Sequence, residues 1–141
     1  MDVTLRPGRP DDAAACGRIC YDAFAAIASA HGFPCDFPGP EAAAALTARL
    51  LDHPGIYPVV AEIDGVVVGS NFLDERVAIA GVGPITVDPA VQDSTVGRRL
   101  MEAVMDRAAQ QRAAGVRLVQ SGSHMRSLAL YAKLGFTVRE P

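Results

Sequence analysis

The change from strand to helix around Pro89 constrains this sequence more than any other feature. Apolar and β-branched residues over 77–87 predict a strand, in which Gly81, Gly83 and Pro84 predict a bulge or a splayed backbone. A long helix follows, and its apolar stripe consists of Val96, Leu100, Ala103, Val104 and Ala108. A helix that starts behind a strand presents unpaired N–H groups and the positive end of its dipole, which favours a phosphorylated ligand.

Shorter periodic segments lie on both sides of this junction. Strands are predicted over 3–6, 57–63, 66–73, 116–120 and 135–138, and helices over 10–30, 40–51 and 126–134. Asp64-Gly65 predicts a hairpin, because both turn positions tolerate a positive φ. The long helix is expected to start at Asp93 or Ser94 and to end at Gly115, and the strands that it connects should be parallel neighbours. This order predicts one α/β (α+β) domain over residues 1–141.

Composition and charge argue against several function classes. The 141 residues suffice for one core, and no apolar run approaches the ~20 residues that span a bilayer. The net charge is −3 and the basic residues are scattered, so we expect no nucleic-acid partner and no membrane surface. The N-terminus has no secretory pattern, and we expect a cytoplasmic protein.

Three cysteines, Cys16, Cys20 and Cys35, are an odd number, which argues against a disulfide framework and fits a reducing compartment. Together with His31 they have a spacing from which a Cys3His zinc site can be drawn. The pairs lack a Cys-x-x-Cys knuckle, and cysteine is commonly a small buried residue. We therefore favour buried thiols and expect no metal.

Two segments resemble the GNAT superfamily of acyl-CoA-dependent N-acyltransferases. The family pattern Gln/Arg-x-x-Gly-x-Gly/Ala is similar to residues 92–97, Gln-Asp-Ser-Thr-Val-Gly, which follow Ile-Thr-Val-Asp-Pro at 85–89. The pattern Asn-x-x-Ala-x-x-Leu-Tyr-x-Lys-x-Gly-Phe is similar to residues 124–136. With the order of elements, the resemblance covers nearly the whole chain. It implies a mixed, mostly antiparallel central sheet with a splayed parallel pair and helices on both faces.

The resemblance also implies that acetyl-CoA binds at the splay as the acyl donor. The pantetheine arm is expected along the strand edge at Ile85, Thr86 and Val87, with a backbone N–H near Val87 on the thioester oxygen. The pyrophosphate is expected on a turn formed by Gln92, Asp93, Ser94, Thr95, Val96, Gly97 and Arg98. Further cofactor contacts are expected from His124, Ser127, Leu130 and Lys133.

Two residues depart from the family patterns. Thr95 stands where the first glycine is usual, and a positive φ there would cost a β-branched residue roughly 1–2 kcal/mol, with weaker pyrophosphate binding as the result. His124 stands where asparagine is usual, so the contact of that asparagine is not carried over. A capped helix after a strand would explain the first segment alone, and the second segment favours the cofactor.

For the chemistry, the resemblance implies that Tyr131 is the general acid that protonates the departing CoA thiolate. Without the family, a tyrosine in the core would be the better interpretation. Asp74 and Glu75 are candidates for the base, although such carboxylates are usually just solvated, and an amine that arrives neutral needs no strong base. Candidates for the acceptor pocket, which alternatively cover the core, are Phe33, Phe37 and Tyr57.

The family usually adds one more strand beside 116–120, and this sequence stops at Pro141. We therefore expect a homodimer, or a further C-terminal segment, to cover that edge. The predicted function is direct transfer of an acetyl group from acetyl-CoA to a primary amine, without a metal. A non-catalytic acyl-CoA-binding or regulatory domain is the alternative, and a structural domain that binds no CoA is a third.

Overall fold

The computed structural model describes residues 2–91, 95–119 and 125–139. The strands are β1 (Val3–Pro7), β2 (Ile56–Ile63), β3 (Val66–Asp74), β4 (Ile79–Val82), β5 (Thr86–Val87) and β6 (Gly115–Leu118). The helices are the short 3-10 helix η1 (Pro10–Asp12) and the α-helices α1 (Ala13–His31), α2 (Pro40–Asp52), α3 (Thr95–Gln110) and α4 (Met125–Lys133). The helices and strands predicted from periodicity are confirmed, except at the positions corrected below.

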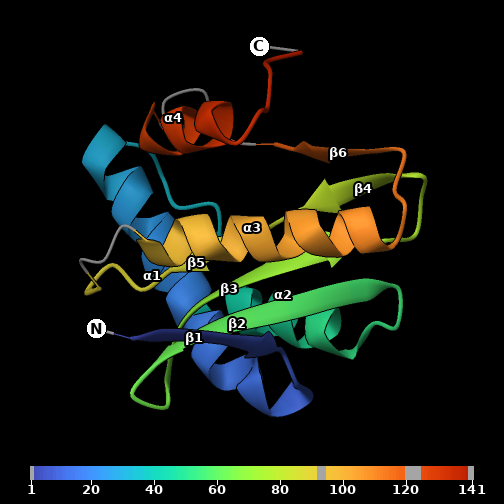
Figure 1. Ribbon diagram of the computed structural model, residues 1–141. Coiled ribbons are helices and arrows are strands. Elements are labelled where there is room, and N and C mark those ends of the chain that lie inside the picture. The colour runs from blue at the N-terminus through green and yellow to red at the C-terminus, as the bar shows by residue number, and fades with distance from the viewer. Residues whose placement is uncertain (1, 92–94, 120–124, 140–141) are drawn as a thin grey trace.

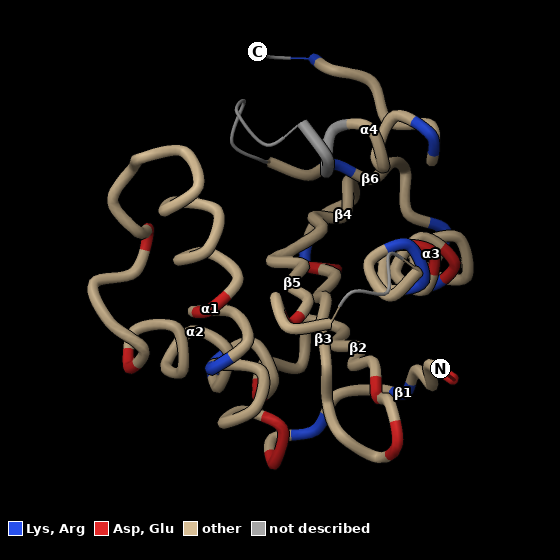
Figure 2. Tube along the Cα trace, turned by 90° about the vertical axis from the view of Figure 1, so that its left-hand side faces the viewer, with Lys and Arg blue, Asp and Glu red and all other residues tan. Residues whose placement is uncertain are grey.

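The described strands form one mixed sheet in the order β1-β2-β3-β4-β6, with β5 paired to β3. Neighbours are antiparallel except β4 and β6, which are parallel and are connected through α3 (Figure 1). Figure 2 shows α1 and α2 on one side of the sheet and α3 on the other. These two sides are called the α1–α2 face and the α3 face below. The predicted mixed α/β sheet with a parallel pair and helices on both faces is confirmed.

The hairpin between β2 and β3 follows from its turn residues. Asp64 has φ 53° and Gly65 has φ 77°, and they join Ile63 directly to its partner Val66. Positive φ at both central positions is the type I′ geometry, whose twist matches that of the two strands. The turn predicted from Asp64-Gly65 is thereby confirmed.

The main hydrophobic core fills the α3 face. Its buried members are Val59, Ala61, Ile63, Val68, Leu73, Ala80, Val96, Leu100, Val104 and Ala108. Gly69 allows α3 to approach the sheet, because a Cβ there would lie 2.9 Å from the Thr86 carbonyl oxygen and 3.0 Å from Leu100. Burying aliphatic side chains stabilises a fold by roughly 1.5–3 kcal/mol each, so this face holds α3 firmly in place. A smaller cluster on the other face consists of Leu51, Ile56 and Phe72.

A charged network joins the N-terminal elements. Arg6 on β1 donates to both carboxylate oxygens of Asp12, at 2.9 and 2.8 Å, and to Glu62 on β2 at 3.3 Å. Asp12 also accepts the backbone N–H of Arg9 at 2.7 Å. The Arg6 guanidinium is the main cause of a lowered pKa of Asp12, against the effect of burial. The start of α1 is therefore tied to β1 by an ion pair whose aspartate is buried.

Three sequence predictions differ from the structure. The helix predicted to end at Gly115 ends at Gln110, because Arg112 takes a φ of 56° and Gly115 begins β6. The strand predicted over 77–87 is interrupted by Gly83-Pro84 and forms β4 and β5, as its glycines and proline suggested. Residues 135–138, predicted as a final strand, are described and are not in a strand. Of the described helices, none is both long and apolar enough to cross a membrane.

Candidate functional site

The sheet opens where β4 ends. The parallel pairing of β4 with β6 runs from Ile79 to Val82, and Val82 is the partner of Leu118. Beyond Gly83 the chain continues into β5, which pairs with β3. Among the described residues no strand pairs with the other edge of β5. The parallel pair therefore splays after Val82 and leaves a strand edge at residues 86–87.

Backbone groups of this edge point away from β3. The Asp88 N–H donates to the Val68 carbonyl at 2.8 Å, so the peptide at Asp88 faces β3. Hydrogen-bonded and non-hydrogen-bonded pairs alternate along antiparallel strands, so the neighbouring pair of Val87 with Gly69 is expected to be a non-hydrogen-bonded one. The N–H and C=O groups of Val87 consequently face the open edge. A ligand lying along the edge can use both groups.

The helix α3 starts at the end of this edge. Gly97 lies in its first turn, and among the described side chains a Cβ there would meet only Val87 Cγ2, at 3.9 Å. Gly97 is also not one of the described glycines that have a positive φ. Within the described part of the chain, neither packing nor backbone conformation requires a glycine at this position. A glycine here instead leaves room for a ligand close to the helix backbone.

Thr95 is the first residue of α3, and the non-glycine described residues with positive φ are Asp64 and Arg112. The strain considered for Thr95 is therefore not present in this structure. The Val96 side chain is fully buried in the core, which leaves its backbone for ligand contact. Gln92, Asp93 and Ser94 lie outside the described residues.

Two arginines near the start of α3 have different surroundings. Arg99 donates to the main-chain carbonyl of Val3 on β1 and so belongs to the packing of the sheet. The Arg98 side chain is 63% exposed, and its one ion pair with a described residue is a long contact of 3.9 Å with Glu102. Arg98 is therefore the better placed of the two to add positive charge for a phosphate.

One contact beside the junction was missed by sequence reasoning. Arg18 on α1 lies 3.6 Å from the Asp88 carboxylate, which also accepts the Ala90 N–H at 3.0 Å. The Arg18–Asp88 pair links α1 to the turn that precedes α3. No sequence pattern reveals it, because its partners are separated by the whole hairpin region.

The second family-like segment forms α4. Figure 1 places this helix near the end of the molecule at which α3 begins. Tyr131 is 7% exposed, and its ring packs edge-on to Phe136 with centroids 6.1 Å apart. Leu130 is half-buried and Lys133 is exposed. His124 lies outside the described residues, as does the side chain of Ser127.

The two candidate bases face opposite sides of the sheet. Both Asp74 oxygens accept hydrogen bonds from Arg76, at 2.9 and 2.6 Å, and this pairing lowers the pKa of Asp74 to about 2. Both Glu75 oxygens accept hydrogen bonds from Arg107 on α3, at 2.7 and 3.1 Å. The low pKa of Asp74 makes its carboxylate a weak proton acceptor. Glu75 is directed toward α3, on the face that the core fills.

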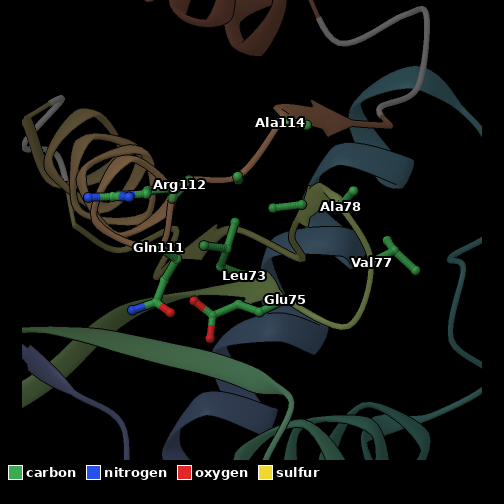
Figure 3. A pocket seen from close by; sticks show the side chains of 10 residues that line it. Leu73, Glu75, Val77, Ala78, Gln111, Arg112 and Ala114 are labelled. Carbon is green, nitrogen blue, oxygen red and sulfur yellow. The ribbon is translucent and has the colours of Figure 1, made fainter.

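Glu75 lines a pocket of about 250 Å³ at the C-terminal end of α3 (Figure 3). Its other labelled lining residues include Leu73, Val77, Gln111 and Arg112. This pocket is at the opposite end of α3 from Gly97. It is therefore separate from the strand-to-helix junction.

The three aromatic candidates are not brought together. Phe33 and Phe37 lie in the connection between α1 and α2, where Phe33 is 61% exposed and Phe37 packs edge-on to Phe24 at 5.4 Å. Tyr57 lies under the guanidinium of Arg107 on α3, at 4.5 Å. Tyr57 therefore belongs to the α3 face, whereas the loop with Phe33 and Phe37 belongs to the other face.

The cysteines are free thiols. Cys16 and Cys20 are buried, and burial raises the pKa of Cys16 to about 11 and that of Cys20 to about 12. Cys35 is partly exposed. Within residues 2–91, 95–119 and 125–139, no three His, Cys, Asp or Glu side chains gather so as to hold a metal ion.

Residues 21–136 match the model of the acetyltransferase (GNAT) family. The fold is shared with PaiA N-acetyltransferase from Thermoplasma acidophilum in complex with coenzyme A, at 15% identity and a TM-score of 0.83 over 100% of this chain and 93% of that chain. It is also shared with AAC(6')-Iy in complex with the bisubstrate analogue CoA-S-monomethyl-acetylneamine, at 15% identity and a TM-score of 0.76 over 100% and 95%. No curated protein sequence matches significantly.

Proposed function

Because this chain belongs to the GNAT acetyltransferase family, we propose that it transfers an acetyl group from acetyl-CoA directly to a primary amine. The observation that carries the proposal is the pairing of an open strand edge at Val87 with a helix turn that has space at Gly97. The edge offers backbone hydrogen bonds to the pantetheine arm. The turn offers N–H groups and a helix dipole to the pyrophosphate.

Structural neighbours with bound CoA or with a CoA bisubstrate analogue support acetyl-CoA as the donor. The chain would hold the cofactor with backbone groups, so that Thr95 in place of glycine need not weaken binding. Arg98 would add positive charge beside the phosphates. Leu130 and Lys133 on α4 are proposed to contact the arm and the phosphate end of the same molecule.

In the reaction, the amine nitrogen attacks the thioester carbonyl carbon, a C–N bond forms, and the C–S bond breaks. The outward N–H near Val87 would stabilise the oxyanion of the tetrahedral intermediate. Such a donor lowers the activation barrier by about 3–4 kcal/mol. Tyr131 would give its proton to the departing thiolate and regain one from solvent. The amine nitrogen loses one proton, so the products are the amide and CoA.

The proton from the attacking amine is proposed to leave to water. Asp74 is held ionised by Arg76, and Glu75 is bound to Arg107, so neither carboxylate is prepared to accept a proton. An amine that arrives neutral needs no strong base. The rate should then rise with pH as the fraction of neutral acceptor grows.

The test is release of free CoA from acetyl-CoA in the presence of a panel of amines, for the natural protein and for Tyr131→Phe. We expect Tyr131→Phe to lower kcat by about 10²–10⁴-fold, the range for a general acid, while calorimetry shows unchanged affinity for acetyl-CoA. Equal turnover in both proteins would remove Tyr131 from the mechanism. Binding of acetyl-CoA without turnover of any amine would favour the non-catalytic alternative.

A further inference from the structure

The open edge of the candidate site belongs to a very short strand. β5 consists of Thr86 and Val87, and it pairs with β3 at these two positions. Two pairs fix the alignment of a strand less firmly than the longer ladder between β2 and β3 does. The direction of the backbone groups along this edge therefore depends on the residues that follow β5.

The first of these residues, Asp88, fixes the peptide at the end of the edge. Its N–H donates to the Val68 carbonyl on β3 at 2.8 Å. This peptide is trans, and the N–H and C=O groups of a trans peptide point in opposite directions. The carbonyl of Val87, which shares the peptide, is thereby turned toward the open edge. Any rotation of this peptide would turn the same carbonyl away from a ligand.

The Asp88 side chain closes the turn that holds this peptide in place. Its Oδ1 accepts the Ala90 N–H at 3.0 Å, and its carbonyl oxygen accepts the Val91 N–H at 2.9 Å. An aspartate that accepts the N–H two residues further on forms a local turn of its own. Pro89 restricts the backbone between the two residues, because its ring fixes φ. The Asp88 side chain is only 19% exposed, so this hydrogen bond is partly shielded from water.

The second oxygen of the same carboxylate faces α1, which packs against β3 and β5. Arg18 Nη1 on α1 lies 3.6 Å from Asp88 Oδ2 and 3.5 Å from Asp22, one turn further along α1. The Arg18 side chain is 53% exposed, and an exposed ion pair of this length contributes little to stability. We therefore assign the positioning of the turn to the hydrogen bond with Ala90, and to Arg18 the orientation of the carboxylate.

Resting on the proposed function, we propose that Asp88 is a positioning residue of the donor site. By closing the turn after β5, its side chain keeps the N–H and C=O groups of Val87 directed at the open edge, along which the pantetheine arm of acetyl-CoA would lie. The carboxylate is bound to Ala90 and faces Arg18, so it acts through the backbone and not by touching the ligand. An effect through the arm must appear equally with acetyl-CoA and with acetyl-pantetheine, which has no pyrophosphate.

The experiment measures the Kd of both ligands by calorimetry in the natural protein and in variants whose thermal unfolding shows them to be folded. Asp88→Ala removes the hydrogen bond to Ala90 and should weaken both ligands about tenfold, which is the size of one hydrogen bond from a charged group. Asp88→Asn keeps an oxygen for the Ala90 N–H and should bind both ligands within about threefold of the natural protein. Amide hydrogen exchange at Ala90 should be faster in Asp88→Ala and unchanged in Asp88→Asn.

The matched control is Asp22→Ala, which removes the other ion pair of Arg18 and leaves the turn after β5 unchanged. It should keep the natural affinity for both ligands. A loss in Asp22→Ala as large as that in Asp88→Ala would assign the effect to the charge around Arg18 and overturn the inference.

The remaining outcomes also decide the inference. Equal affinities in Asp88→Ala and the natural protein overturn it and leave the acetyltransferase proposal standing. A loss confined to acetyl-CoA overturns it as well, because the effect would then lie at the phosphates. The same holds if Asp88→Asn binds as weakly as Asp88→Ala, since the charge and not the hydrogen bond would be responsible. A natural protein that binds neither ligand would contradict the proposed function itself, and this inference with it.

Discussion

At the scale of single residues, two glycines with different surroundings allow the effects of substitution on ligand binding and on protein stability to be tested separately. Gly69 is needed for packing, since a Cβ there would meet the Thr86 oxygen and Leu100 at 2.9 and 3.0 Å. A Cβ on Gly97 would meet only Val87 Cγ2, at 3.9 Å, among the described residues. The packing of the fold thus requires the first glycine, whereas we propose that a bound ligand requires the second.

We predict that Gly97→Ala weakens acetyl-CoA binding at least about tenfold, because the new methyl group occupies the space beside the helix backbone. The same change should leave the free energy of unfolding unchanged or raise it by up to about 1 kcal/mol, since alanine favours a helix. Calorimetric titration and urea unfolding measure the two effects. The control, Gly69→Ala, should destabilise the protein, and unchanged acetyl-CoA affinity in Gly97→Ala would argue against phosphates at this turn.

At the scale of elements, the ion pair between β1 and the start of α1 depends on pH. The pKa of Asp12 is lower in the folded protein than in the unfolded chain, where an aspartate has a pKa of about 3.9. The stabilisation is therefore complete above that value and is lost as the pH falls through the lowered folded pKa. Since the Asp12 side chain is only 8% exposed, screening by water is limited.

We predict that Asp12→Asn lowers the free energy of unfolding by about 1–3 kcal/mol at pH 7, the range for a hydrogen bond to a charged group. The difference from the natural protein should shrink between pH 4 and pH 2. Urea unfolding at a series of pH values measures it, with the exposed Asp52→Asn as a control. A difference that stays constant down to pH 2 would mean that the charge of Asp12 contributes nothing.

Elements whose signals are local could be predicted from the sequence, and those that depend on distant partners could not. Asp64-Gly65 specifies its hairpin by backbone preference alone, and the stripe through Val96 and Leu100 specifies α3. Arg112 terminates α3 in a left-handed conformation, which an arginine side chain does not favour. The sequence therefore predicted that the helix ends at Gly115 instead. The ion pairs of Asp74 and Glu75 depend on arginines that the fold brings close. The sequence does not show these partners, so both carboxylates were candidates for the base.

At the scale of the whole molecule, a ligand at the splay would join elements that are distant in sequence. The edge at Val87 and the first turn of α3 both pack against the main hydrophobic core of the α3 face. A ligand that binds only the folded state stabilises all of it by mass action.

We predict that acetyl-CoA at 100 times its Kd raises the free energy of unfolding by about 2.7 kcal/mol, which corresponds to a rise in Tm of roughly 5–10 °C for a chain of this length. Thermal unfolding with and without the ligand measures it. Acetyl-pantetheine at the same concentration should give a smaller shift, because it lacks the pyrophosphate. A Tm that is the same with and without acetyl-CoA would show that the protein has no donor site.

The buried thiols of α1 have a practical consequence for following turnover. Cys16 and Cys20 are at most 1% exposed and have pKa values raised to about 11 and 12, so very little thiolate is present at neutral pH. A thiol-reactive dye should therefore titrate only Cys35 in the native protein and all 3 cysteines after denaturation. In a continuous assay, the enzyme itself would contribute one rapid equivalent of colour, after which every further equivalent reports released CoA.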